Sequence, residues 1–288
     1  MRGDYVTRAI QLALEEDIGT GDVTTAVTVP AGVRASGHFL AKSPGVVSGL
    51  DVAAATFREV DPRVAFIALV RDGDRVVPGD LIARVAGEAR SLLAAERVAL
   101  NFLQRLSGVA TATARYAEAV TGTGARVIDT RKTTPGMRLM EKAAVRHGGG
   151  HNHRFGLSDG ILIKDNHLAA IGGPDRVARA VAAAQAGAPH TLRVEVEVTS
   201  LDELEQALAA GADVVLLDNM AVDQMAEAVR RTRGRAILEA SGGITLETIR
   251  RIAETGVDLI SVGALTHSAP SLDISLELTL ETGDATGE

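Results

Sequence analysis

A short segment, residues 131–154, concentrates positive charge in a protein that is acidic overall. The whole sequence has 30 Lys and Arg against 37 Asp and Glu, a formal net charge of −7 at pH 7. The segment nevertheless holds six Lys or Arg and three His against a single acid, Glu141. Arginine binds planar anions through two parallel hydrogen bonds, and the three consecutive glycines at 148–150 would let backbone N–H groups approach a ligand closely. The segment therefore predicts an anion pocket, with Arg131, Lys132, Arg138, Lys142, Arg146, Arg154, His147, His151 and His153 as its candidate residues.

Lysine is rare in this chain and is gathered near the same segment. Only four of the 30 basic residues are lysines, and three of them, Lys132, Lys142 and Lys164, fall between 132 and 164. Lysine is a compact ammonium that can give up a proton, whereas arginine cannot. We therefore expect chemical roles for Lys132 and Lys164. For Lys142, within LMEKAAV, a chance position on a helix surface is the plainer interpretation.

Polar side chains with chemical potential recur where each predicted strand of the second half ends. The spacing is 21 residues from Glu197 to Asp218, 23 from Asp218 to Ser241 and 22 from Ser241 to Gly263. In a β/α barrel this recurrence places the residues around the C-terminal rim, where active sites form. The rim residues are Asp129 to Lys132, Lys164 to His167, Glu195, Glu197, Asp218, Asn219, Glu239 to Gly243 and Gly263 to His267.

Two of these acids, Glu195 and Glu197, alternate with valines, so both should leave the same face of a strand, near a barrel mouth. SGG at 241–243 and VGAL at 262–265 precede predicted helices, whose first backbone amides bind phosphate well. Acids between two anion sites suit sugar hydroxyls, or Mg²⁺ bridging phosphates.

The elements that must position these residues alternate between strand and helix from about residue 126. This rhythm predicts a parallel sheet and a complete or incomplete β/α barrel. A doubly wound sheet is the competing fold, but no GxGxxG follows a first strand. Expected strands cover 126–129, 160–165, 193–198, 213–218, 236–240 and 258–263, and expected helices cover 174–187, 201–211, 221–232 and 246–256.

The first part of the chain differs in character. After an amphipathic first helix it shows β-like runs at 34–42, 45–49, 64–70 and 72–87, and then a helix over 91–107 that Ser91 can cap and Gly108 can end. We therefore expect an α/β sandwich domain over 1–110 and a barrel domain over 111–268. Arg97, Asn101 and Arg105 form a polar stripe on the predicted helix.

The composition bounds the class of protein. A chain of 288 residues with 46% hydrophobic residues fits one or two globular domains, and only 2% aromatics implies an aliphatic core. The absence of cysteine excludes disulfides, thiolate metal sites and a cysteine nucleophile. No run is long enough for a membrane helix, and acids near the N-terminus argue against a signal peptide, so we expect a cytoplasmic protein. The net charge argues against general nucleic-acid binding.

Three other interpretations of the basic segment were weighed. HNH at 151–153, with His147 and His167 nearby, could suggest zinc, but no HExxH pattern is present and the surrounding cations repel a metal ion. Lys164 at a strand end could form a Schiff base. An RNA-binding protein could use the basic patch, although the scarcity of aromatics argues against base stacking.

The segment 129–167, DTRKTTPGMRLMEKAAVRHGGGHNHRFGLSDGILIKDNH, resembles the quinolinate phosphoribosyltransferase family, also called nicotinate-nucleotide pyrophosphorylases (carboxylating). The resemblance covers essentially the whole chain, with EEDIGTGDVTT at 15–25, ERVALNFLQRLSG at 96–108, and then VEVEV, LLDNM, EASGG and VGALTH in the family's order. A paralogous group from molybdenum-transport loci shares DTRKT but diverges around GGGHNHR and IKDNH, both of which are intact here. That group is the second alternative.

The resemblance implies an N-terminal α/β sandwich and an open β/α barrel, with the tail 269–288 packing back on the sandwich, and an assembly that is at least a dimer and could be a hexamer. It implies the reaction of quinolinate with phosphoribosyl pyrophosphate (PRPP) and Mg²⁺ to give nicotinate mononucleotide, pyrophosphate and CO₂. No nucleic-acid or membrane partner is expected.

The resemblance also implies site residues. Lys132, Lys164, Glu197 and Asp218 would be catalytic, and Glu197 and Asp218 would associate with Mg²⁺, directly or through PRPP or water. The quinolinate positions would be Arg97, Thr130, Arg131, Lys132, His153, Arg154 and Lys164, with Arg97 reaching the site of the other protomer. The PRPP positions would be Lys132, Lys164, Glu197, Asp218, Ser241, Gly242, Gly243, Val262, Gly263, Ala264 and His267.

Overall fold

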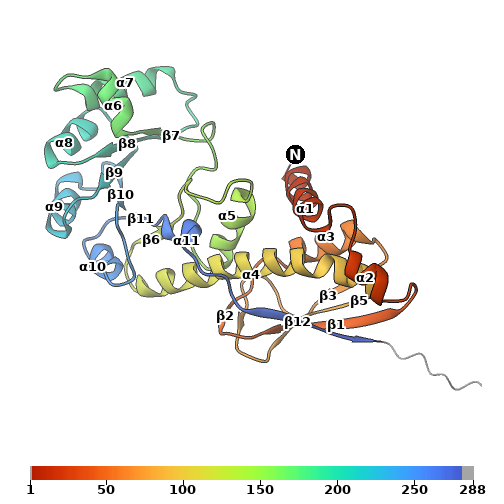
Figure 1. The fold of residues 1–288 in the computed structure, drawn as a ribbon. Coiled ribbons are helices and arrows are strands. Elements are labelled where there is room, and N and C mark those ends of the chain that lie inside the picture. Colours follow the sequence, from red (N-terminus) through yellow and green to blue (C-terminus); the bar gives the residue numbers. More distant parts are fainter. Residues whose placement is uncertain (1, 281–288) are drawn as a thin grey trace, which may run out of the picture. The chain divides into compact units, whose positions relative to one another are not determined.

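The structure is a computed structural model that describes residues 2–280 (Figure 1). It contains two compact units. The first unit comprises the chain up to Ala112, the segment Thr134–Gly149 and the chain from Ser268 onward. The second unit comprises Thr113–Thr133 and Gly150–His267. Within residues 2–280, no helix is both long enough and apolar enough to cross a membrane.

The first unit is built on an antiparallel sheet with the strand order β12-β1-β5-β3. Alternate residues of β1 are buried, as expected for a strand with one face on the core. That core includes Phe39 and Phe57, whose ring centroids lie 6.0 Å apart, together with many aliphatic side chains. The strands are β1 (Arg34–Ala41), β3 (Ala65–Ala68), β5 (Leu81–Glu88) and β12 (Ile274–Leu280), and a separate pair is formed by β2 (Gly45–Val46) and β4 (Arg75–Val76).

The last strand, β12, lies within the tail 269–288 that was expected to pack back on the N-terminal domain. It pairs with β1 in antiparallel register, with Phe39 opposite Leu276, so the chain does return to the first sheet. Residues 281–288 of the expected tail lie outside the described residues. The expected domain limits, 1–110 and 111–268, stay a prediction.

The helices of the first unit include one that is much longer than predicted. Helix α4 runs from Ala89 to Ala119, so the expected stop at Gly108 was wrong. Gly108 is needed for close packing instead, because a Cβ at this position would collide with the carbonyl oxygen of Pro270. Ser91 is not a cap either; its hydroxyl donates to Asp61. The other helices are α1 (Arg2–Ile18), α2 (Val23–Thr28), α3 (Leu50–Val60) and α5 (Arg138–His147).

The second unit is a six-stranded parallel sheet with the order β6-β11-β10-β9-β8-β7. The consecutive strands β6 and β7 form its two edges, so the barrel stays open between them, as predicted. All six predicted strands are present within a few residues of the expected limits. They are β6 (Arg126–Ile128), β7 (Ile161–Ile163), β8 (Val194–Val198), β9 (Val214–Asp218), β10 (Ile237–Ser241) and β11 (Leu259–Ser261).

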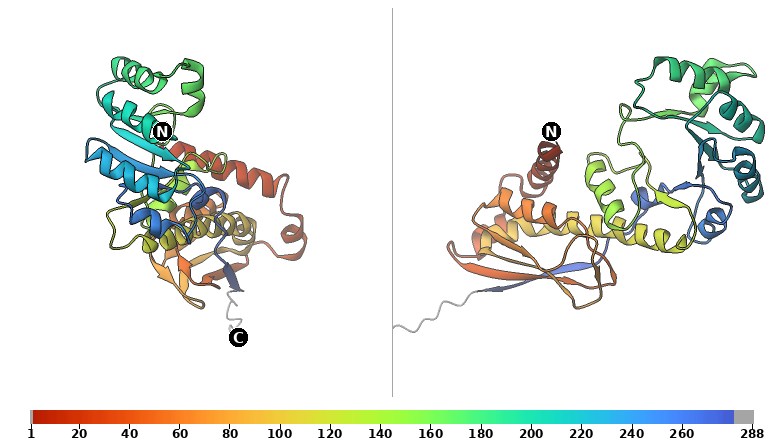
Figure 2. Two further views of the ribbon diagram at one scale, coloured as in Figure 1. Left: turned by 90° about the vertical axis from the view of Figure 1, so that its left-hand side faces the viewer. Right: turned by 180° about the vertical axis from the view of Figure 1, so that it is seen from behind.

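Helices connect these parallel strands and follow one another along the outer side of the curved sheet (Figure 2). In β8 the valines Val194, Val196 and Val198 are fully buried, while Glu195 and Glu197 alternate with them, so the two acids share the opposite face of the strand, the face from which Glu195 points to His153. This arrangement excludes the doubly wound alternative. The helices are α6 (Asp165–Ile171), α7 (Arg176–Gly187), α8 (Leu201–Ala209), α9 (Val222–Thr232), α10 (Ile249–Ala253) and α11 (Ala264–His267).

Candidate active site

The carboxyl ends of the six strands bring most of the predicted site residues to one edge of the second unit. Strand register fixes this arrangement, since Ser241 of β10 is paired with Asp218 of β9, and Val198 of β8 with Leu217 of β9. Lys164 directly follows β7 and caps α6, while Asp129 to Lys132 directly follow β6. The expected C-terminal rim is therefore a feature of the fold.

Lys164 and Glu197 form an ion pair at this rim, with Lys164 Nζ 3.6 Å from Glu197 Oε2. Burial raises the pKa of the Glu197 carboxyl, the positive charge of Lys164 opposes this shift, and the charges of Asp218 and Asp165 add to it. Glu197 and Asp218 lie at adjacent strand ends and have the oxygen ligands that Mg²⁺ prefers. These residues therefore fit the predicted magnesium association.

Asn219 orients the second of these acids. Its side-chain amide donates to Asp218 Oδ2 at 3.0 Å, and its own backbone takes a left-handed conformation, with φ of 53°. Gly242 packs directly on this amide with φ of 100°, so a Cβ at position 242 would collide with Asn219 Oδ1. The close packing of Gly242 on Asn219 therefore links the turn at residues 241–243 to Asp218 at the end of the neighbouring strand β9.

Lys132 lies beside the last loop of the rim. A methyl group placed on Gly263 would come within 3.1 Å of His267 Nε2 and 3.2 Å of Lys132 Cδ. The hydroxyl of Thr266 donates to the Lys132 carbonyl at 2.7 Å, and Thr130 Oγ1 accepts from the Lys132 amide at 3.0 Å. Lys132 and His267, both predicted on the PRPP side, are therefore neighbours.

The positive charges of Arg131 and Arg154 act on each other on the open side of the barrel. Burial lowers the pKa of Arg154, and the neighbouring charge of Arg131 lowers it further, while Glu195 and Asp159 oppose both effects. Arg154 Nη1 donates to the Gly160 carbonyl at 2.9 Å, but its Nε is buried without a hydrogen-bond partner. A buried donor without a partner is costly, and an anion would satisfy it.

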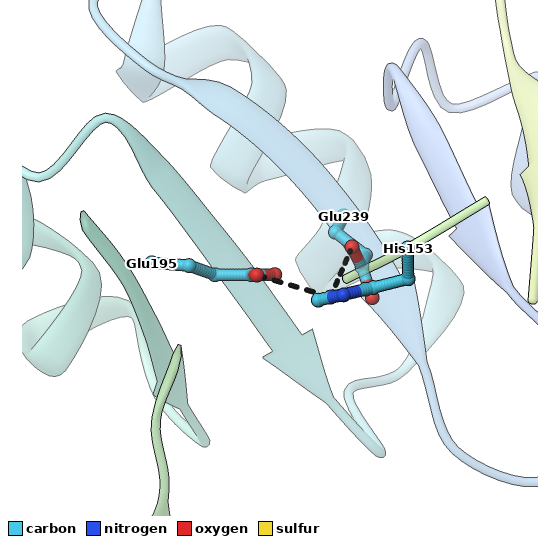
Figure 3. A group of neighbouring side chains, drawn as sticks. All are labelled: His153, Glu195 and Glu239. Atoms are coloured by element: carbon cyan, nitrogen blue, oxygen red, sulfur yellow. Dashed lines mark ion pairs between the residues drawn. The ribbon is translucent and has the colours of Figure 1, made fainter. Parts of the chain in front are cut away.

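His153 was predicted beside these cations, yet its ring contacts acids inside the curved sheet (Figure 3). His153 Nε2 lies 3.1 Å from Glu195 Oε2 and 3.7 Å from Glu239 Oε2. The two acids are 7% and 1% exposed. Burial raises the pKa of Glu239 well above its ordinary value, and the charge of Glu195 raises it further.

The structure does not gather the histidines that suggested zinc into one group of possible metal ligands. Within the described residues, the one group of possible ligands within 4.8 Å of one another is His153, Glu195 and Glu239. His147 is not in this group: it belongs to the first unit, where its Nδ1 lies 2.8 Å from Ser48 Oγ.

One expectation about a residue of the first unit was wrong. Lys142 is 0% exposed, so it does not lie on a helix surface. Arg105 lies on the same helix as Arg97 and Asn101, as the predicted polar stripe requires, and its guanidinium pairs with the fully buried Glu141 at 2.8 Å. Arg97 itself is exposed on α4.

Sequence reasoning did not find the roles of two buried acids, Asp129 and Glu239. Asp129 is fully buried and accepts from the His153 amide at 2.9 Å and from Asn152 Nδ2 at 2.6 Å, which fixes the segment after the triple glycine. Glu239 was among the polar residues predicted at strand ends, but its partner residues were not predicted. Glu195 comes from β8, two strands away in the sheet, and His153 comes from a loop. Its position in an apolar strand, ILEAS, was the available signal.

Comparison with known sequences decides the family. Residues 22–107 match the N-terminal domain of quinolinate phosphoribosyl transferase, and residues 109–277 match its C-terminal domain. The chain belongs to the quinolinate phosphoribosyltransferase family.

Individual relatives resemble the chain over nearly its full length. It is 47% identical to a nicotinate-nucleotide pyrophosphorylase (carboxylating) of Mycobacterium leprae, over 96% of this chain and 98% of that protein. It is 45% identical to a probable nicotinate-nucleotide pyrophosphorylase (carboxylating) of Bacillus subtilis, over 92% and 90% of the two chains. The crystal structure of NadC from Streptococcus pyogenes, 47% identical, superposes with a TM-score of 0.90 over 95% of this chain and 96% of that one.

Proposed function

We propose that this protein transfers the phosphoribosyl group of PRPP to quinolinate and releases CO₂ and pyrophosphate, giving nicotinate mononucleotide for NAD biosynthesis. Its family membership and the names of its full-length relatives support this activity. The observation that carries the assignment of the pocket is the partly buried Arg154, whose guanidinium feels the positive charge of Arg131 and has a buried Nε without a hydrogen-bond partner.

Quinolinate matches this pocket because it carries two adjacent carboxylates on a planar ring. An arginine fork binds one carboxylate with two hydrogen bonds, and a second cation is needed for its neighbour. This positive charge comes from four residues on the open side of the barrel, between the ends of β6 and β7. They are Arg131, Lys132, Arg154 and Lys164. Thr130 and His153 complete the quinolinate positions that the family resemblance implies. A monocarboxylate such as nicotinate would leave cations without partners.

The PRPP side follows the rim toward β9, β10 and β11. Glu197 and Asp218 face the ribose, the turn at Ser241 to Gly243 and the loop at Val262 to Ala264 receive the 5′-phosphate, and His267 lies beside Lys132. Glu197 and Asp218 would hold Mg²⁺, directly or through PRPP or water, and the ion would neutralise charge on the departing pyrophosphate.

The reaction proceeds by two bond exchanges. The ring nitrogen of quinolinate forms a bond to C1 of the ribose as the bond from C1 to the pyrophosphate oxygen breaks. The oxocarbenium-like C1 is stabilised by the negative charges of Glu197 and Asp218. The resulting pyridinium draws electrons from C2, so the C2 carboxylate leaves as CO₂. The electron pair left on C2 then takes a proton, for which Lys132 and Lys164 are both candidate donors.

Arg97 completes the site from another copy of the chain. It is exposed on α4 in the first unit, and the resemblance implies that the matching arginine enters the partner's quinolinate site. We therefore propose a homodimer with shared active sites, which could assemble further into a hexamer. A cytoplasmic location stays a prediction.

A product assay tests the proposed function. Purified protein is mixed with quinolinate, PRPP and Mg²⁺, and nicotinate mononucleotide is detected by chromatography. Formation of the mononucleotide only when all three are present supports the proposal. Its absence from a folded, dimeric preparation contradicts it.

A further inference from the structure

The His153 imidazole is held from both sides, and the two contacts assign its protons. Its Nδ1 accepts a hydrogen bond from the backbone N–H of Arg154 at 2.7 Å. A nitrogen that accepts carries no proton, so the proton of the neutral ring is on Nε2. Nε2–H points between Glu195 and Glu239, at 3.1 and 3.7 Å from their nearer oxygens.

The two acids form a rigid support for this ring. Glu195 comes from β8 and Glu239 from β10, with β9 between them, so the curvature of the sheet brings both side chains to one point. Each carboxyl is more than nine-tenths buried, and each retains one oxygen without a hydrogen-bond partner. The N–H of His153 is therefore a donor to the nearer oxygens of this buried pair, in addition to the Ser261 side chain that hydrogen-bonds Glu239.

A metal ion at this cluster is the obvious alternative, and the tautomer argues against it. A histidine that binds a metal through Nε2 carries its proton on Nδ1 and donates it to an acceptor. Here Nδ1 faces an N–H donor. Arg154 also places a positive charge near Glu195, which would repel a cation.

The His153 ring helps to position Arg154. The backbone amide of His153 is fixed on Asp129 at 2.9 Å, the next amide is fixed on the His153 ring, and Arg154 Nη1 is fixed on the Gly160 carbonyl. The buried Arg154 Nε is left without a partner. These contacts fix where the Arg154 guanidinium lies.

We propose that Glu195 and Glu239 are positioning residues that, through Nε2–H of His153, fix the ring on the Arg154 amide and so aim the Arg154 guanidinium at a carboxylate of the pyridine substrate. The proposal rests on the proposed function for the identity of that substrate. It also changes the expected role of His153, which acts on the substrate through Arg154 and not through its own ring nitrogens.

The first test reads the tautomer directly in the wild-type dimer. Long-range ¹H–¹⁵N spectra of protein labelled on histidine distinguish Nδ1–H from Nε2–H, and a His153→Gln variant identifies the signals of His153. We expect the neutral Nε2–H form, unchanged when Zn²⁺ or Mn²⁺ is added. A proton on Nδ1, a doubly protonated ring or specific metal-induced changes in these signals would overturn the proposal.

The second test separates positioning from folding. Glu239→Gln keeps an acceptor for Nε2–H and adds a donor to Glu195, whereas Glu239→Leu removes both. We expect Glu239→Leu to raise KM for quinolinate about 10- to 100-fold, with KM for PRPP within about twofold of wild type, and Glu239→Gln to restore most of the loss. Asp258→Asn is the matched control, because this acid accepts from the Leu238 amide at the opposite strand end.

The outcomes distinguish this proposal from the proposed function. Equal increases in both KM values, or unchanged kinetics in a folded Glu239→Leu protein, would overturn the positioning role. If Glu239→Leu does not fold, the wild-type tautomer and the Glu239→Gln and Glu195→Gln variants decide the question. Wild-type protein that forms no mononucleotide but shows the Nε2–H ring would contradict the function and leave the ring arrangement standing.

Discussion

Lys164 Nζ lies 3.6 Å from Glu197 Oε2, so a cation of the proposed quinolinate pocket touches an acid of the proposed PRPP site. The contact lies where β7 and β8, neighbours in the parallel sheet, end at the rim. Lys164 is about half exposed, whereas Glu197 is buried. This lysine can therefore respond to both substrates, and its exchange for arginine is informative.

Lys132→Arg and Lys164→Arg should each lower kcat by about 10²- to 10⁴-fold, the usual cost of losing a positioned proton donor. Both substitutions keep the charge, but a guanidinium is wider and cannot give up its proton. The matched control is Lys42→Arg, since Lys42 is half exposed and pairs with Glu277 at 3.7 Å. Steady-state kinetics measure the effect; wild-type turnover in both rim variants would reduce these lysines to counter-charges.

Glu197→Ala and Asp218→Ala should weaken PRPP binding and leave quinolinate binding nearly intact. Each removes a carboxylate from the rim between the two predicted anion sites, and the loss of one charged contact corresponds to about 10- to 100-fold in Kd. Calorimetric titrations with Mg²⁺ present measure the two ligands separately. A variant that binds PRPP normally but quinolinate weakly would show that the two sides are reversed.

Asp61 predicts a pH-dependent contribution to the stability of the first unit. The Arg63 guanidinium, the Arg63 amide and the Ser91 hydroxyl hold the pKa of the Asp61 carboxyl well below its usual range. A depressed pKa stabilises the fold fully at pH values above the unfolded-state pKa of about 3.9, and this contribution is lost as the pH falls from there through the much lower pKa of the folded state. Asp61→Asn should therefore lower the free energy of unfolding most at neutral pH.

Urea denaturation at about pH 7 and about pH 2 measures this difference, which should be clearly smaller at the lower pH, where protonation of the carboxyl in the folded protein begins to compete. Asp17→Asn is the control, because Asp17 is exposed near the end of α1. A difference that stays constant between the two pH values would contradict the assignment.

Arg97 and Lys164 should complement each other between subunits. Arg97→Ala and Lys164→Ala homodimers should each be nearly inactive, since each lacks one half of every shared site. Random mixing of the two chains gives about half mixed dimers with one intact site of two, so about a quarter of wild-type activity should return. Mixed dimers that form but recover no activity would place Arg97 in its own chain's site.

The sequence predicted the second unit better than the first. Runs such as DVVLLD are apolar on both faces, as parallel strands buried between layers must be, and the regular spacing of polar residues marked their ends. The predicted helix at 91–107 ended too early because Gly108 was interpreted as a helix stop. In the structure the small size of Gly108 allows the backbone at Pro270 to pack closely against α4. Local sequence carries no sign of a contact with a residue so distant along the chain.

The site shows the same limit. The position of Glu197 and Asp218 at the rim follows from their spacing, and that of Lys132 and Lys164 from their place at predicted strand ends, because the strand ends of a parallel sheet meet at one edge. The burial of Lys142 and the support of His153 by Glu239 do not. Glu239 and Glu195 meet only because the sheet curves, and curvature depends on the packing of the whole unit.

The most direct measurement of the central claim compares two pyridine substrates. The protein is incubated with PRPP, Mg²⁺ and either nicotinate or quinolinate carrying ¹³C in its C2 carboxylate, and nicotinate mononucleotide and ¹³CO₂ are measured together. The cation-rich pocket predicts equal amounts of mononucleotide and ¹³CO₂ from quinolinate, with little or no turnover of nicotinate. Equal or faster turnover of nicotinate, or mononucleotide formed from quinolinate without ¹³CO₂, would contradict the account.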